Sequence, residues 1–395
     1  MRPLENVKIL DLSRVLAGPF CTMLLADLGA EVVKVEIPGT GDDSRAFGPF
    51  KNNKSMYFLS INRGKKSISI NMKTEKGRKM ILDLVKEFDV IVENFKPGTM
   101  EKLGLGYDVI KEINPKIIYA ASSGFGHTGP DSKKPAYDIL VQAMGGVMSI
   151  TGWPNTPPTR VGMSIGDITV AFYTAMGILA GLYQRTITGL GQKVDVAMLD
   201  CQMSILENAM LRYQADGVAP QPIGNRHPTI TPFQAYKAKD EYFVIGVGND
   251  SLFVKFCNAI NRCDLLEDER FKTNGARTKN LKEINEILDS VFLTKSVSEW
   301  IDILGKAQVP ASPINTMDKV VKHPQLIARN MIVDVEDKVI GHVKIAGNPI
   351  KMTNIPDENY RNPAPEIGEH NEEILSKILR YSKEEIAKLK EDGII

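Results

Sequence analysis

Short apolar runs alternate with longer amphipathic segments along the first third of the chain. Helical patterns lie at 18–29 and 74–88. Strand patterns surround them, at 7–13, 31–36, 67–72, 89–94 and 116–123. Because alternation of this kind builds βαβ units, the pattern predicts an α/β fold with a doubly wound, Rossmann-like parallel sheet. Ligands of such sheets bind beyond the carboxyl ends of the strands.

The pattern changes beyond residue 200. Proline and turn residues fill 220–236, and the strand pattern at 241–250 runs into a Gly-x-Gly turn. Charged helical patterns follow, then a hairpin pattern at 333–347 and an amphipathic helix at 382–392. We therefore expect a large domain joined to a smaller α+β domain. The expected segments are the first part of the large domain at 1–200, a linker at 201–230, the small domain at 231–330 and a return to the large domain at 331–395.

A single carboxylate interrupts the most apolar stretch of the chain. Asp167 is the only charged residue between Arg160 and Arg185. The roughly 18 apolar residues after it include threonine, tyrosine and glycine, which predicts a buried core helix rather than a membrane span. Asp167 could cap this helix by accepting a backbone N–H. Alternatively, it is a desolvated carboxylate, which is more reactive as a nucleophile and more readily protonated.

Composition narrows the class of protein. The 395 residues are 43% hydrophobic and 25% charged, enough for a sizeable core. Lys and Arg total 49 against 48 for Asp and Glu, so the charge balance favours neither nucleic acid nor an anionic membrane surface. The four cysteines form no CxxC pair and no Cys/His cluster, and we expect neither structural zinc nor disulfides. The first residues contain no secretory signal pattern, so a cytoplasmic location is expected.

A nicotinamide enzyme is the first class that a Rossmann-like sheet suggests. Glu36 ends the second strand pattern, where a ribose-binding acid would lie. The turn after the first strand reads SRVLAGPF, however, with one glycine where a pyrophosphate-binding loop needs G-x-G-x-x-G. The sequence therefore argues against a nicotinamide cofactor.

The order of several motifs resembles that of the class III CoA-transferase family. The motifs are LDLSRVLAGPFCTMLLADLGAEVVKVE, GDDSR, NRGKKSISINMK, VENFKPG, SSGFGHTGP, PAYDILVQAMGG, GDI, TGLGQKVDVAM, ITPFQAY, GVGND and IGEHNEEIL. The resemblance covers essentially the whole chain and is strongest to the succinyl-CoA:glutarate type. It implies the class III fold, in which the small domain is inserted into the large one and two chains interlock as a homodimer.

The resemblance also implies a covalent mechanism. Asp167 matches the family's nucleophile, which attacks an acyl-CoA thioester to give an acyl–aspartyl anhydride and then an aspartyl-CoA thioester. The substrates would be an acyl-CoA and a free carboxylic acid, such as succinyl-CoA and a dicarboxylate. No metal, tightly bound cofactor, nucleic acid or membrane is expected to take part.

Further site residues follow from the same resemblance. Gly246, Gly248 and Asn249 match the glycine-rich loop that covers the nucleophile in the family. Ile37 stands where many members carry a nucleotide-binding arginine, and Lys65 and Lys66 are hypothetical substitutes for that cation. The positions that match CoA-binding residues are Leu16, Ala17, Ile37, Ile70, Lys73, Asn94, Phe95, Lys96, Lys102, Tyr137 and Asp138.

Two alternatives use the same fold. α-Methylacyl-CoA racemases move a proton with a His and an Asp, but the matching stretch here places Tyr137 where the histidine stands. His127 lies in a turn with no obvious partner, so we interpret it as a loop histidine. A catalytically silent CoA-binding module is the other alternative. Arg226, His227 and Thr229 lie where related enzymes shape the acceptor pocket, and a cation there would suit a dicarboxylate.

Overall fold

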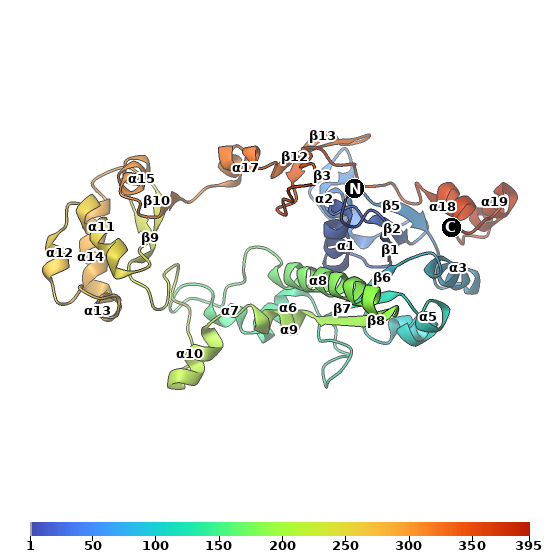
Figure 1. Ribbon diagram of the computed structural model, residues 1–395, viewed down its shortest axis with the longest axis horizontal. Helices are drawn as coiled ribbons and strands as arrows, with labels where there is room; N and C mark the ends of the chain where they lie inside the picture. Colours follow the sequence, from blue (N-terminus) through green and yellow to red (C-terminus); the bar gives the residue numbers. More distant parts are fainter. Residues whose placement is uncertain (1) are drawn as a thin grey trace. The chain divides into compact units, whose positions relative to one another are not determined.

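The computed structural model describes residues 2–395 and divides the chain into two compact units (Figure 1). Unit 1 consists of Met1–Met148, Arg160–Val218 and Pro324–Ile395. Unit 2 consists of Ser149–Thr159 and Ala219–His323. In the sequence, both segments of unit 2 lie between segments of unit 1, and Ser149–Thr159 falls within the range 1–200 that we expected for the first part of the large domain.

Unit 1 contains the parallel sheet that the alternating pattern predicts. Its strand order is β5-β2-β1-β6-β7-β8, and every pairing is parallel. The strands are β1 (Lys8–Asp11), β2 (Glu31–Glu36), β5 (Lys66–Ser69), β6 (Val90–Glu93), β7 (Ile118–Ser123) and β8 (Gln192–Ala197). The chain runs outward from β1 to β2 and β5, then returns to lay β6 beside β1. The order of the strands therefore reverses between β1 and β6, which makes this the topological switch point of the sheet.

Alternating residues of the strands feed a core on each face of the sheet. On one face, Ile9 and Val32 pack with residues of α1 (Ala17–Asp27) and α8 (Ile165–Thr188), two helices that lie side by side in Figure 1. On the other face, Leu10 and Val33 pack with residues of α3 (Glu75–Val85) and α5 (Tyr107–Ile113). The two faces confirm the doubly wound arrangement.

The last part of the chain returns to this second core. Ile374 of α18 (Asn371–Lys377) and Leu389 of α19 (Lys383–Glu391) are buried in it. The Asn71 N–H donates to the Ile394 carbonyl at 2.8 Å, which ties the chain end to the residues after β5. The predicted hairpin is present as β12 (Ile332–Asp337) and β13 (Gly341–Ala346).

Shorter elements complete unit 1. Between β2 and β5 lie η1 (Asp43–Ala46), β3 (Phe50–Lys51), β4 (Lys54–Ser55) and α2 (Met56–Asn62). The others are α4 (Thr99–Lys102), α6 (Asp138–Met144), α9 (Met198–Ser204), α10 (Ala209–Asp216) and α17 (Pro324–Ala328). The short helix α7 (Val147–Ile150) includes the last residues of this segment of unit 1 and the first of unit 2.

Unit 2 is a small α+β body. Its antiparallel sheet has the order β11-β10-β9, formed by β9 (Phe233–Lys237), β10 (Tyr242–Gly246) and β11 (Ala311–Pro313). The helices are α11 (Asp250–Ala259), α12 (Asp264–Glu267), α13 (Asn274–Lys279), α14 (Leu281–Phe292), α15 (Val297–Lys306) and α16 (Met317–Val320). An aromatic core fixes them, in which the Phe292 ring lies against the rings of Tyr236, Phe243 and Trp300. Unit 2 thus has a core of its own.

The helix α8 has two apolar faces. Within unit 1 its inner face packs on β7, β8 and α1. Its outer face exposes a stripe of large apolar side chains, formed by Phe172, Met176, Leu179, Tyr183 and Ile187. By length and composition alone α8 could cross a membrane. The prediction of a buried core helix is therefore correct only for the inner face.

Candidate active site

Asp167 lies in the first turn of α8 and does not cap the helix. The side chain that satisfies a backbone N–H there is Asp138, the first residue of α6, whose Oδ1 accepts from Gly166 N at 2.8 Å. The N-cap residue of α8 is Ser164, and its side chain makes no capping bond. The capping interpretation of Asp167 is therefore wrong, because its carboxylate makes no capping bond to the helix.

Two carboxylates thus stand close together at the start of α8. Burial, followed by the negative charge of Asp138, raises the pKa of Asp167 to about 7. Desolvation and a like charge both disfavour the ionised form, and here they outweigh the positive end of the helix dipole. Near neutral pH the side chain is therefore divided between a neutral form and a poorly solvated carboxylate.

Polar side chains of α6 itself and of the segment before α8 hold Asp138 in place. Gln142 Nε2 donates to Asp138 Oδ2 at 2.8 Å, and Gln142 Oε1 accepts from Val161 N at 2.9 Å. Arg160 Nη2 lies 3.5 Å from Asp138 Oδ2, with its side chain partly exposed. These contacts fix the chain before α8 against α6, so Asp138 is a positioning residue for the first turn that carries Asp167.

Tyr57 of α2 is a neighbour of Asp167 that the sequence did not indicate. Burial, the Asp167 carboxylate and the Asp42 carboxylate raise the pKa of Tyr57 to about 12. The phenol keeps its proton at physiological pH and can act only as a donor toward an anion. The signal was not readable in advance, because more than a hundred residues separate Tyr57 from Asp167 in the sequence.

The switch point between β1 and β6 forms a second part of the site. Ile37 and Phe95 line one small cavity there, together with Arg14, Asp42 and Met72. The Arg14 guanidinium lies 5.7 Å from the centre of the Phe95 ring and pairs with Asp43 at 3.0 Å. Arg14 was not among the predicted residues, although its place directly after β1 could have singled it out.

The other predicted CoA-binding residues are spread around this end of the sheet. Leu16 and Ala17 are buried at the start of α1, and Ile70 and Asn94 directly follow β5 and β6. Tyr137 is 76% exposed beside the buried Asp138. The three predicted lysines, Lys73, Lys96 and Lys102, are exposed. Their contact with CoA stays a prediction.

The two hypothetical substitutes for the missing arginine are already engaged. Lys65 is buried, and its Nζ donates to Asp11, Asn62 and the Pro19 carbonyl at 3.0, 2.8 and 2.9 Å. Lys66 pairs with Glu31 and Glu373 at 2.7 and 3.1 Å. Neither is a good ligand for a phosphate, and Arg14 is the better candidate.

His127 has partners that the sequence did not reveal. Its Nδ1 lies 2.9 Å from Lys193 Nζ, and its Nε2 lies 3.7 Å from the buried Glu93 carboxylate. Burial and then the charge of Lys193 lower the pKa of His127, so the imidazole stays neutral. His127 does lie in a loop, as expected, but it is half-buried and has partners that the sequence did not indicate.

The glycine-rich loop belongs to unit 2. Gly246 ends β10, and Asn249 caps α11 by accepting from Leu252 N at 2.9 Å. A Cβ at Gly248 would meet no atom within 4 Å. A side chain at Gly248 would therefore meet no steric obstacle, and the role of the loop over the nucleophile stays a prediction.

Unit 2 also contains the predicted acceptor residues. Arg226 lines a cavity of about 470 Å³ together with Trp153, Asn225 and Lys237. His227 Nδ1 accepts from Thr229 N at 3.2 Å, so this pair stabilises the local turn. Asp289 also lines the cavity, so its charged residues are of both signs, and the preference for an anion stays a prediction.

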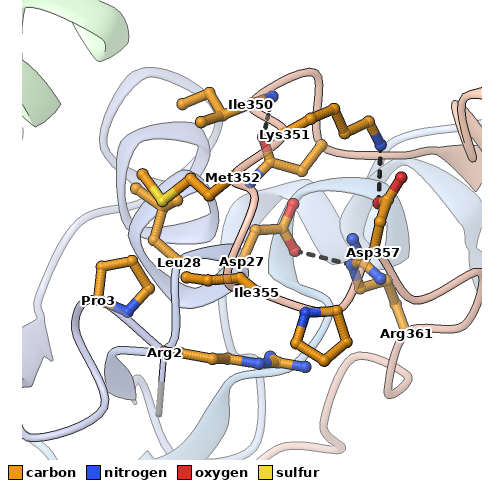
Figure 2. Close-up of a pocket in the computed structure, with 12 residues that line it drawn as sticks. Arg2, Pro3, Asp27, Leu28, Ile350, Lys351, Met352, Ile355, Asp357 and Arg361 are labelled. Carbon is orange, nitrogen blue, oxygen red and sulfur yellow. Dashed lines mark hydrogen bonds and ion pairs between the residues drawn. The ribbon is translucent and has the colours of Figure 1, made fainter.

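A further pocket in unit 1 is closed by its own ion pairs (Figure 2). It lies where the returning chain meets the end of α1, and Asp27 pairs there with Arg361 at 3.3 Å. Lys351 pairs with Asp357 at 2.8 Å across the same pocket. No predicted site residue lines it.

Among residues 2–395, no group of three or more His, Cys, Asp or Glu side chains could hold a metal ion.

Comparison with known proteins decides the family. The profile of CoA-transferase family III matches residues 4–371. The chain belongs to this family. An acetyl-CoA:oxalate CoA-transferase of Acetobacter aceti is 42% identical over 93% of this chain and 93% of its own. The succinyl-CoA:glutarate CoA-transferase of Homo sapiens is 40% identical over 100% of this chain and 90% of its own.

A solved structure agrees with the fold. A CAIB/BAIF family protein from Brucella suis superposes with a TM-score of 0.84 and 38% sequence identity, covering 95% of this chain and 99% of its own. The predicted resemblance and the predicted α/β fold with a parallel sheet are thereby confirmed. The protein is a CoA-transferase, whose substrates include a CoA thioester.

Proposed function

We propose that this CoA-transferase moves CoA from an acyl-CoA to a free carboxylic acid through covalent intermediates on Asp167. The observation that supports this most strongly is the environment of Asp167. Its carboxylate is poorly solvated in the first turn of α8, and burial and Asp138 raise its pKa to about 7. A carboxylate with weakened solvation is a better nucleophile toward a thioester carbonyl.

The proposed reaction has two halves. An oxygen of Asp167 attacks the thioester carbonyl, the C–S bond breaks, and CoA leaves as a thiolate, which gives a mixed anhydride. The thiolate then attacks the aspartyl carbonyl, and the donor acid leaves as a carboxylate. The acceptor carboxylate attacks the resulting aspartyl-CoA thioester and expels the thiolate. Finally, the thiolate attacks the acceptor's acyl carbonyl and restores the Asp167 carboxylate.

The neighbours of Asp167 have separate tasks in this scheme. Tyr57 retains its proton, since burial and the Asp167 and Asp42 charges raise its pKa to about 12. Its hydroxyl can therefore donate a hydrogen bond to the oxyanion that develops at each attacked carbonyl. Asp138 keeps the first turn of α8 in position through its bond to Gly166 N.

We further propose that the acceptor is a dicarboxylate and the donor an acyl-CoA of the same kind, such as succinyl-CoA. Relatives are named for oxalate and for glutarate. In this chain Arg160 lies 3.5 Å from Asp138, beside the nucleophile, with its side chain 44% exposed. A partly exposed guanidinium can bind a second carboxylate with two parallel hydrogen bonds.

The proposed assembly is a homodimer. The outer face of α8 exposes Tyr183 and Ile187 by 71% and 72%, and the stripe continues to Phe172, which contacts Phe20 edge to ring. A contiguous exposed apolar stripe of this kind marks a protein interface. A second copy of the chain is the proposed partner, because the family resemblance implies interlocked chains.

The experiment offers the protein succinyl-CoA with glutarate, oxalate or acetate and follows new CoA esters by mass spectrometry. We expect CoA to move to a dicarboxylic acid, and Asp167→Asn to reduce exchange by at least about a thousandfold while free CoA still binds. A matched control is Asp195→Asn in β8. Unchanged turnover of Asp167→Asn would remove Asp167 from the mechanism. Deuterium entering an α-carbon without CoA movement would instead indicate a racemase.

A further inference from the structure

The turn after β1, residues 13–16, is held by side chains from three other segments. Lys34 Nζ of β2 donates to the Ser13 carbonyl at 2.7 Å. The Asn94 amide after β6 pairs with the Arg14 backbone in both directions, at 2.9 and 2.7 Å. Val15 N donates to the two oxygens of Asp42 at 3.1 and 3.3 Å. We call this set of contacts the turn clamp.

The clamp holds an unfavourable backbone conformation. Val15 has a φ of +68°. A β-branched residue rarely adopts this left-handed region, because its branched side chain meets the adjacent carbonyl. Such strain persists only where the surroundings impose it, and here the hydrogen bonds to Asp42 impose it.

Asp42 is itself fixed by buried partners. It pairs with Lys34 at 2.7 Å, and both side chains are essentially inaccessible to solvent. It also accepts from Ser44 N at 2.8 Å. A buried ion pair sets a precise geometry, since either charge would be costly without the other. Asp42 therefore offers Val15 N a rigid acceptor.

The turn leads directly into the amino end of α1. The first amides of a helix have no partner within it, and no side chain caps α1. A Cβ at Gly18 would lie 2.2 Å from the Ser13 Cβ, so the turn and helix are packed as closely as the chain allows. All of this lies at the switch point between β1 and β6, where ligands of such sheets bind.

We propose that Asp42 is a positioning residue for CoA binding, because it holds Val15 in the left-handed conformation that aims the amides at the start of α1 toward the CoA. Lys34 supports Asp42 in this role. The inference rests on the proposed function, in which CoA is the ligand of this end of the sheet. Asp42 lines the cavity at this end of the sheet, but its side chain is essentially inaccessible to solvent, so it acts through Val15 and need not touch the ligand.

The experiment measures the binding of free coenzyme A by calorimetry, with no transfer step. Val15→Pro forces φ to a negative value and leaves the Lys34–Asp42 pair intact, whereas Val15→Gly accepts a positive φ without strain. We expect Val15→Pro and Asp42→Asn to weaken CoA binding at least about tenfold, and Val15→Gly to weaken it by no more than about threefold. Asp42→Asn combined with Val15→Gly should regain part of the loss.

Asp27→Asn is the matched control for loss of a buried ion pair. Asp27 pairs with Arg63 at 2.7 Å and with Arg361 at the other end of α1 (Figure 2). The Asp27→Asn substitution should lower the melting temperature of the protein without changing its affinity for CoA. Equal affinities of Val15→Pro and Val15→Gly, or an equal loss in Asp27→Asn, would overturn the inference. Wild-type protein that does not bind CoA at all would instead overturn the proposed function.

Discussion

In the proposed reaction, two acidic residues act together at the start of α8: Asp167 of its first turn and Asp138 of α6. Asp167 supplies the nucleophile in the proposed reaction, and Asp138 accepts from Gly166 N at 2.8 Å. Burial, and then the charge of Asp138, raises the pKa of Asp167 to about 7. Asp138 thus positions the nucleophile and tunes it. A carboxylate with a pKa of about 7 becomes ionised as pH rises through that value, so activity should rise with pH in the same range.

Replacing Asp138 by Asn separates the two effects. The amide oxygen can still accept from Gly166 N, but the like charge is gone, so the pKa of Asp167 should fall. We expect the rising limb of kcat/KM against pH to move to lower pH by about one unit. Asp108→Asn, which changes an exposed carboxylate of α5, is the control. An unmoved limb in Asp138→Asn would show that Asp138 does not raise the pKa of Asp167.

Substitution of Arg160 tests whether this residue selects a dicarboxylate as the acceptor. If its guanidinium binds the second carboxylate, Arg160→Met should raise the KM for glutarate by about tenfold or more and leave acetate, where accepted, little changed. Arg160→Lys should raise the KM for glutarate by a smaller factor. Arg185, which pairs with Asp89 at the far end of α8, provides Arg185→Met as a control. An equal effect on both acids would exclude a role of Arg160 in selecting dicarboxylates.

Helices and strands could be predicted wherever the local sequence had a clear hydrophobic pattern of one kind. β2 has the predicted bounds, and α3 lies inside its predicted range, because an apolar strand and an amphipathic helix carry strong patterns. β8 was missed as a strand. It lies at the edge of the sheet and contains Lys193 and Asp195, so its sequence lacks the apolar run of a central strand.

The contacts between elements could not be read from the sequence. Asp138 meets Gly166 across 28 residues, and Asp42 meets Val15 across 27. Neither pair has a periodic signal, and a positive φ at a valine runs against its local preference. Lys65 was misread for a similar reason, since an unpaired lysine is normally exposed and only the fold supplies Asp11 as its buried partner. Family resemblance pointed to both Asp167 and Asp138, but it gave Asp138 as a CoA-binding residue and not as the acceptor for Gly166 N.

At the scale of the whole molecule, the outer face of α8 is the feature that a single chain leaves unexplained. Its apolar stripe covers several turns, whereas the rest of the helix is packed in unit 1. A second copy of the chain would remove this surface from water. The 43.7 kDa chain should therefore have twice that mass in solution.

Charged substitutions in the exposed apolar stripe of α8 test whether this stripe forms the interface of the homodimer. The double substitution Tyr183→Glu and Ile187→Glu should yield monomers in light scattering, because two carboxylates would have to be buried in the interface. Val254→Glu changes an equally apolar, 45% exposed residue of unit 2 and should leave the dimer intact. A dimer that survives the double substitution would place the interface elsewhere.

The covalent role of Asp167 can be observed directly. The enzyme is mixed with succinyl-CoA, quenched in acid during turnover, digested and examined by mass spectrometry. The account predicts added mass, from an acyl group or from CoA, on the peptide that contains Asp167, and no such mass in Asp167→Asn. Quenched samples of active enzyme in which that peptide is never modified, or in which another residue carries the added mass, would contradict the account.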